Sequence, residues 1–114
     1  MADPRRGEVW MLDLSPVRGH EQDGTRPALI LSVDEFNSSK AGLVMVLPIT
    51  SRRKYSLPTH IPIDPPEAGL TMASVILCDQ VRSVSKDRLV RHMGTVKPST
   101  LAAVEPIVKV LLGL

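Results

Sequence analysis

The sequence predicts a small, mainly β domain that closes into a barrel and carries one helix at its C-terminal end. Most of the chain consists of short runs of branched aliphatic residues separated by Gly, Pro, Asn and Asp. Short strands spaced by such turn signals are typical of small barrels. Near the C-terminus, Leu101, Val104, Val108 and Leu111 recur with a helical period instead. With 114 residues, of which 43% are hydrophobic, we expect a single domain over residues 1–114.

The first predicted strand covers residues 8–14 and is followed by a proline. The second, residues 28–33, is apolar on both faces and is therefore expected at the centre of the fold. Further strands are expected at residues 43–49, 60–63, 74–77, 80–84 and 93–96, and a short helical turn capped by Asp34 at residues 34–39. Pro62 belongs on an edge strand or at a bulge, because proline cannot donate to a strand ladder.

The predicted C-terminal helix begins near Pro98, because proline suits a first helical turn. Lys97 then occupies the cap position, where its side chain offers no acceptor. Pro106 removes a helical hydrogen bond, which costs about 3 kcal/mol in a straight helix, so we expect a kink there or two short helices. Residues 107–112 are apolar nearly all round, and one barrel cannot bury every side of such a helix. We therefore expect a homodimer with part of this segment near the interface.

Several classes of protein are disfavoured by what the sequence lacks. No apolar run approaches the roughly 18 residues that cross a bilayer, and residues 1–6 lack the apolar stretch of a secretory signal. We expect a cytoplasmic protein that does not enter membranes. The single cysteine, Cys78, lies in a Val-Ile-Leu run and is expected to be a buried hydrophobe rather than a nucleophile. No Cys/His cluster has the spacing of zinc ligands, so no metal site is expected.

The net charge of +2 is too small to indicate a function, but its distribution is uneven. Residues 52–54 form one basic block, and a second basic stretch spans residues 86–97. Local basic patches attract a phosphate backbone even when the total charge is small. Ordinary solvated surface charge explains these features equally well.

Three polar segments are candidates for a functional site. Residues 15–27, between the first two strands, form a connection much longer than a tight hairpin turn and rich in charged groups. At residues 48–51 an apolar strand ends in two hydroxyl residues, which ordinarily cap the next turn. Residues 79–82 form a polar cluster directly after a strand that we expect to be buried.

These segments occur in an order that resembles the MazF/PemK toxin family, also called mRNA interferases. The resemblance runs from Arg6 to Gly113 and rests on the stretches RGEVW (6–10), GHEQ (19–22) leading to Arg26-Pro27, PITS (48–51) and SVILCDQVR (74–82). It implies an SH3-like barrel of the CcdB/PemK type with a C-terminal helix, and a homodimer. It also implies sequence-selective cleavage of single-stranded messenger RNA without a metal or other cofactor. A cognate antitoxin protein would occupy the RNA groove.

The same resemblance implies roles for individual residues. Arg26 and Thr50 fall on the catalytic pair of the family. The expected RNA contacts are Glu21, Gln22, Ser51 and Gln80, with Arg52 and Arg82 beside them. His20 departs from the family pattern, since a small hydroxyl residue is common at that position. We expect His20 to contact RNA or to point outward, with proton transfer as the alternative.

Metal-free cleavage of RNA uses the neighbouring 2'-hydroxyl as the nucleophile and leaves a 2',3'-cyclic phosphate and a 5'-hydroxyl. Arg26 suits stabilisation of charge on the phosphate, because its planar fork binds two oxygens. Arginine is an implausible general base, since its pKa exceeds about 12. Glu21 is the better candidate for that role, and His20 is a second.

Two other functions fit the same predicted fold. CcdB-type toxins share the barrel but poison DNA gyrase without catalysis, and fold alone does not separate the two functions. The elements Glu21-Gln22, Arg26-Pro27 and Thr50 favour the ribonuclease. A simple SH3-like interaction module requires an aromatic-lined groove, and this chain has only three aromatic residues, Trp10, Phe36 and Tyr55.

Overall fold

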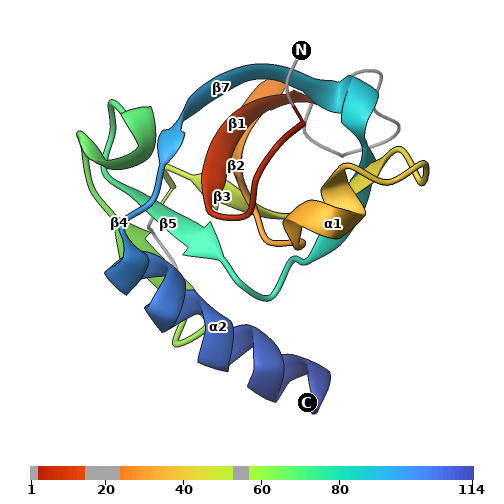
Figure 1. Cartoon of the computed structure of the whole chain (residues 1–114). Coiled ribbons are helices and arrows are strands. Elements are labelled where there is room, and N and C mark those ends of the chain that lie inside the picture. Colours follow the sequence, from red (N-terminus) through yellow and green to blue (C-terminus); the bar gives the residue numbers. More distant parts are fainter. Residues whose placement is uncertain (1–2, 15–23, 53–56) are drawn as a thin grey trace.

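The computed structural model describes residues 3–14, 24–52 and 57–114. These residues form seven strands, two α-helices and two short 3-10 turns. In chain order they are β1 (Glu8–Asp13), β2 (Thr25–Ile30), α1 (Asp34–Asn37), β3 (Leu43–Thr50), β4 (His60–Ile63), η1 (Glu67–Gly69), β5 (Ser74–Leu77), β6 (Arg82–Ser85), η2 (Lys86–Arg88), β7 (Leu89–Thr95) and α2 (Pro98–Leu112). The mainly β architecture with a C-terminal helix is as predicted (Figure 1).

The strands form one antiparallel sheet that curls into a barrel-like shape (Figure 1). Its order is β4-β5-β3-β2-β1-β7, and β6 pairs with the first half of β3. Within the described residues the strand ladder stays open, because β4 and β7 end the order. The expectation of a barrel closed on itself is therefore wrong in this detail. In place of a further strand, η1 lies beside β7. A Cβ on Gly94 of β7 would be 2.6 Å from the carbonyl carbon of Ala68 in η1, so the two backbones are in contact.

Side chains alternate between the two faces of the sheet and build two apolar clusters. One cluster fills the barrel interior and comprises Trp10, Leu12, Ala28, Ile30, Val44, Val46, Val84 and Leu89. The other lies beneath α2 and includes Val9, Leu29, Leu47, Ile49, Ile76, Val104 and Val108. Neighbouring residues of β2 thus serve different clusters. This confirms the prediction that the second strand, apolar on both faces, is central, since β2 lies between β1 and β3.

Helix α2 packs on the sheet through Val104 and Val108, which are buried. Pro98 lies in its first turn as predicted, and Lys97 at the N-cap makes no side-chain cap. One helix continues across Pro106, so the alternative of two short helices is wrong. The physical reason is that the buried valines on either side of the proline hold both halves against the sheet.

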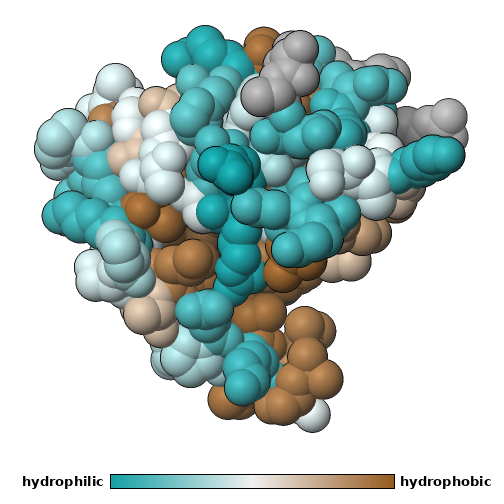
Figure 2. Space-filling view, in the orientation of Figure 1, coloured by the Kyte–Doolittle hydropathy of each residue, from teal (hydrophilic) through white to brown (hydrophobic). Residues whose placement is uncertain are grey.

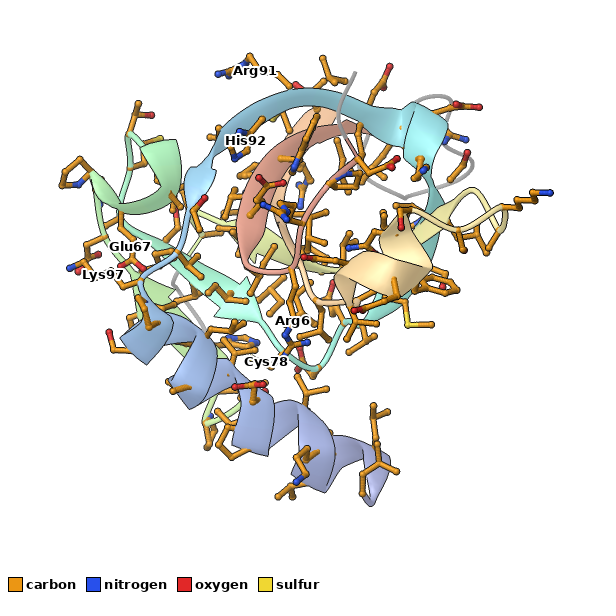
Figure 3. All side chains as sticks on the ribbon, in the orientation of Figure 1. Arg6, Glu67, Cys78, Arg91, His92 and Lys97 are labelled. Atoms are coloured by element: carbon orange, nitrogen blue, oxygen red, sulfur yellow. The ribbon has the colours of Figure 1, made fainter. Side chains whose placement is uncertain are left out.

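The start of α2 is capped from outside the helix. Glu67 of η1 accepts hydrogen bonds from the Lys97 backbone N–H at 2.9 Å and from the Thr100 hydroxyl at 2.6 Å (Figure 3). A carboxylate at this end also interacts favourably with the helix dipole. Further along, Arg6 donates to the Leu31 carbonyl and pairs with Glu105 of α2 at 2.5 Å. These contacts tie α2 to the barrel at two points.

Several predicted boundaries need correction. The second strand begins at Thr25 rather than at residue 28, the sixth at Arg82 rather than at residue 80, and the seventh at Leu89 rather than at residue 93. The N-cap of α1 is Val33, not Asp34. The Asp34 carboxylate instead accepts from the Arg6 backbone N–H at 2.8 Å. In each case long-range pairing overrides a local signal.

Other expectations are confirmed. Pro62 lies on the edge strand β4. Cys78 is fully buried. Among the described residues no helix is both long enough and apolar enough to cross a membrane.

Candidate active site

A pocket of about 350 Å³ opens where β1, β2 and β3 meet the segment between η1 and β5. Its floor consists of buried and half-buried apolar side chains, namely Met11, Pro27, Ile49, Leu70 and Met93. Its rim consists of the exposed residues Thr25, Ser51, Arg52, Thr71 and Met72. Arg26 and Thr50 are half-buried between floor and rim, and Ser74 is buried beside them. We call this site the Arg26–Thr50 pocket.

Arg26 belongs to strand β2, where it pairs with Leu12 of β1. The sequence predicted it in the loop before that strand, which is wrong. Pairing extends the strand back to Thr25 because β1 offers a partner as far as Asp13. A guanidinium on a paired strand is positioned more precisely than one on a loop.

Thr50 is the last residue of β3 and pairs with Val75 of β5. Its hydroxyl oxygen accepts a hydrogen bond from the Arg52 backbone N–H at 3.1 Å. This is the turn-capping role that a strand-end hydroxyl ordinarily has. The hydroxyl proton, which this bond does not use, is available for a ligand in the pocket.

The structure brings together four of the predicted site residues and separates two others from them. Arg26, Thr50, Ser51 and Arg52 all line the pocket. Gln80 and Arg82 do not, being exposed residues between the end of β5 and the start of β6. The remaining predicted site residues, His20, Glu21 and Gln22, lie outside the described part of the chain.

Sequence reasoning missed the other side of the pocket. Met11, Leu70, Met72 and Met93 carry no local motif and come from three separate parts of the chain. For Met11 the available signal was the alternation of side chains along β1. Trp10 and Leu12 point into the barrel interior, so Met11 between them points to the other face of the sheet. The others come together only when η1 meets β7.

The electrostatics of the pocket favour an anion. Two arginines, Arg26 and Arg52, are among the residues that line it, and no aspartate or glutamate is among the described lining residues. Arginine side chains bind phosphate oxygens in a bidentate manner. A phosphate group therefore fits the charged side of the pocket.

Other reactive groups of the described structure lie elsewhere. Burial, and next the charge of Asp79, raise the pKa of Cys78 from 9.0 to about 11, so the buried thiol stays protonated at neutral pH. His60 lies 3.7 Å from Asp79, and His92 lies 3.4 Å from Glu8. Neither histidine lines the pocket. In the described part of the chain no group of three or more His, Cys, Asp or Glu residues is arranged to hold a metal ion.

Comparison with known proteins decides the family. Residues 5–112 match the family model described as PemK-like, MazF-like toxin of type II toxin-antitoxin system. The chain belongs to the PemK/MazF-like toxin family. That match includes every residue of the Arg26–Thr50 pocket.

Relatives within the PemK/MazF-like family align over nearly the whole chain. The chain is 38% identical over 111 residues to an endoribonuclease MazF of Staphylococcus saprophyticus, covering 96% of this chain and 92% of that protein. It is 33% identical over 114 residues to endoribonuclease MazF9 of Mycobacterium tuberculosis, covering 96% and 97%.

Solved structures support the same family assignment. The fold is similar to that of MazF from Deinococcus radiodurans, with a TM-score of 0.83, 32% identity and full coverage of both chains. It is also similar to a mycobacterial endoribonuclease solved in complex with its cognate antitoxin, with a TM-score of 0.79, 26% identity, and coverage of 100% of this chain and 97% of that one.

Proposed function

We propose that this PemK/MazF-like protein is a toxin endoribonuclease that cleaves single-stranded messenger RNA at selected sequences without a metal or other cofactor. The observation that carries the proposal is the convergence of Arg26 and Thr50 in one cationic pocket. The relatives described above are endoribonucleases that align with nearly the whole chain, and they support this class of reaction. Residues 1–114 act as one domain. Because the proposed substrate is messenger RNA, we expect the protein to act in the cytoplasm.

In the proposed reaction the 2'-oxygen of one nucleotide attacks the adjacent phosphorus, and the bond from phosphorus to the 5'-oxygen breaks. A general base takes the 2'-hydroxyl proton, and an acid supplies a proton to the leaving 5'-oxygen. Arg26 binds the non-bridging oxygens and stabilises their developing charge. The Thr50 hydroxyl donates a hydrogen bond to the same phosphate. The products are a 2',3'-cyclic phosphate and a 5'-hydroxyl.

Glu21 is the proposed general base, with His20 as the alternative. Further contacts to RNA are assigned to His20, Gln22, Ser51, Arg52, Gln80 and Arg82. Of these, Ser51 and Arg52 have the support of lining the pocket. Gln80 and Arg82 would contact RNA that extends beyond it.

The decisive experiment incubates the purified protein with a defined single-stranded RNA in excess EDTA. We expect discrete fragments with 5'-hydroxyl ends. Arg26→Ala should lower cleavage by about 100- to 1,000-fold, as does loss of one preorganised charge-stabilising donor. Arg5→Ala is the matched control, because Arg5 is an exposed arginine that pairs with Asp34 outside the pocket. Normal cleavage by a folded Arg26→Ala variant would refute the assignment.

The same assay tests the gyrase-poison alternative. Intact RNA, together with arrest of DNA gyrase, would replace the proposed function by that one. No described residue favours the poison specifically, and the relatives named above are endoribonucleases.

Two protein partners complete the proposal. A cognate antitoxin binds and neutralises the toxin, as the antitoxin complex of a mycobacterial relative suggests. A second copy of the chain forms a homodimer, supported by the exposed apolar end of α2. Val110 in its last turn is 78% exposed, and Leu114, just beyond the helix, is 82% exposed. Figure 2 shows hydrophobic side chains gathered over this end of the helix.

A further inference from the structure

The Arg26–Thr50 pocket has an apolar floor that binding of a phosphate does not require. Two arginines and several hydroxyls are sufficient partners for a phosphate group. Yet the floor holds Met11, Pro27, Ile49, Leu70 and Met93, and Met72 lies on the rim. Three of the chain's five methionines therefore line this one pocket.

Methionine side chains are suited to hold a flat, polarisable ring. Their thioether sulfurs make favourable contacts with aromatic rings, and their flexibility lets them adjust to ring shape. Unpaired bases usually stack on aromatic side chains, but no aromatic residue is part of the described lining. At about 350 Å³ the pocket has the size of a small-ligand site.

The rim supplies groups that can read the edge of such a ring. Thr71 is exposed, and its hydroxyl both donates and accepts hydrogen bonds. Ser74 donates to the Met72 carbonyl at 2.8 Å. Ser74 is the first residue of β5, so this bond holds Met72, the neighbour of Thr71, to the start of that strand.

We propose that this pocket is a base-recognition subsite, in which Met11 and Met93 hold one unpaired RNA base and Thr71 hydrogen-bonds to its edge. The base belongs to a nucleotide adjoining the phosphate held by Arg26. This inference rests on the proposed ribonuclease function and adds to it the residues that select sequence. The subsite contributes mainly to the choice of cleavage site, whereas Arg26 contributes to the rate at every site.

Binding is tested first, on the wild-type protein with 13C-labelled methionine methyl groups. The probes are the four 5'-mononucleotides and, as a control without a base, ribose 5-phosphate. We expect at least one nucleotide to shift the methyl signals of Met11 and Met93, and ribose 5-phosphate to leave them in place. Met45, exposed on β3 outside the pocket, is the internal control and should not move. Equal shifts with ribose 5-phosphate, or none with any nucleotide, would overturn the proposal.

Selectivity is tested next, on RNA libraries randomised at one position at a time. Thr71→Val, which removes the hydroxyl but keeps the shape, should change the preference at one position by about two- to tenfold, the range expected for one hydrogen bond. Met93→Ala should weaken the same preference, and Met93→Leu should retain most of it. Met45→Ala is the matched control. Preferences unchanged in Thr71→Val and Met93→Ala, or rates lowered equally for all sequences, would contradict the subsite.

These readouts separate the two proposals. A protein that binds nucleotides through Met11 and Met93 but leaves RNA intact would retain the subsite and refute the ribonuclease. A protein that cleaves RNA with selectivity independent of Thr71 and Met93 would retain the ribonuclease and refute the subsite.

Discussion

In the proposed reaction the Thr50 hydroxyl has two tasks that it can perform together. Its oxygen accepts from the Arg52 backbone N–H, and its proton remains for a phosphate. Thr50→Ser keeps both functions, and we expect its cleavage rate to stay within about threefold of the parent. Thr50→Val removes both and should lower the rate by about 10- to 100-fold, the value of a hydrogen bond to a charged group. Single-turnover cleavage of a defined RNA measures both variants, and equal rates for the two would rule out the hydroxyl.

Cys78 offers a second test at the scale of one residue. Its pKa is raised from 9.0 to about 11 in the folded protein. The native state therefore keeps the thiol proton longer than the unfolded state, and stability should fall as the pH rises from 9 through 11. Urea titrations across this range should give a slope that disappears in Cys78→Ala. At pH 8 the native thiol should resist iodoacetamide, and rapid native alkylation would contradict this assignment.

Among the elements, η1 contacts both the start of α2 and the strand β7. Its Glu67 caps α2 from 30 residues away in sequence. We expect Glu67→Ala to lower the free energy of unfolding by about 1–2 kcal/mol, as loss of a helix cap does. Adding Lys97→Asp should restore part of the loss, because an aspartate at the N-cap supplies its own acceptor. Denaturant midpoints measure both effects, and a double variant no more stable than Glu67→Ala would exclude the capping role.

The contact between η1 and β7 gives a further prediction. A Cβ on Gly94 would lie 2.6 Å from the Ala68 carbonyl carbon, closer than any ordinary contact. Gly94→Ala should therefore destabilise the protein by about 1–3 kcal/mol, as overpacking does. Cleavage should fall as well, since the neighbouring Met93 lines the pocket. An unchanged urea midpoint would mean that the two backbones separate without cost.

The elements also show what the sequence could predict and why the rest was out of reach. Alternation and turn residues identified all seven strands approximately, because each pattern is local. The start of β2 was missed because Arg26 is polar and joins the strand only through its partner Leu12 on β1. The Glu67 cap was missed for the same reason, since no local rule connects it with Lys97. Arg26 and Thr50 were found through motifs, whereas Met72 and Met93 belong to none.

For the whole molecule, the exposed apolar end of α2 predicts association. The wild-type chain should have the mass of a dimer at micromolar concentration in light scattering. Replacing Val110 and Leu114 by glutamate should give a folded monomer, because burying unpaired charges in an interface is unfavourable. Ala103→Glu adds the same charge to an exposed position in the first half of α2 and is the control. A dimer that survives the double replacement would place the interface elsewhere.

The pocket is assembled from distant segments of the chain, from Met11 on β1 to Met93 on β7. No shorter stretch contains it, and it is complete only after Met93 has left the ribosome. A growing polypeptide that has not yet exposed Met93 therefore lacks the complete site. The transcript that encodes this toxin is exposed to the activity of the copy being made only after translation has passed the codon of Met93.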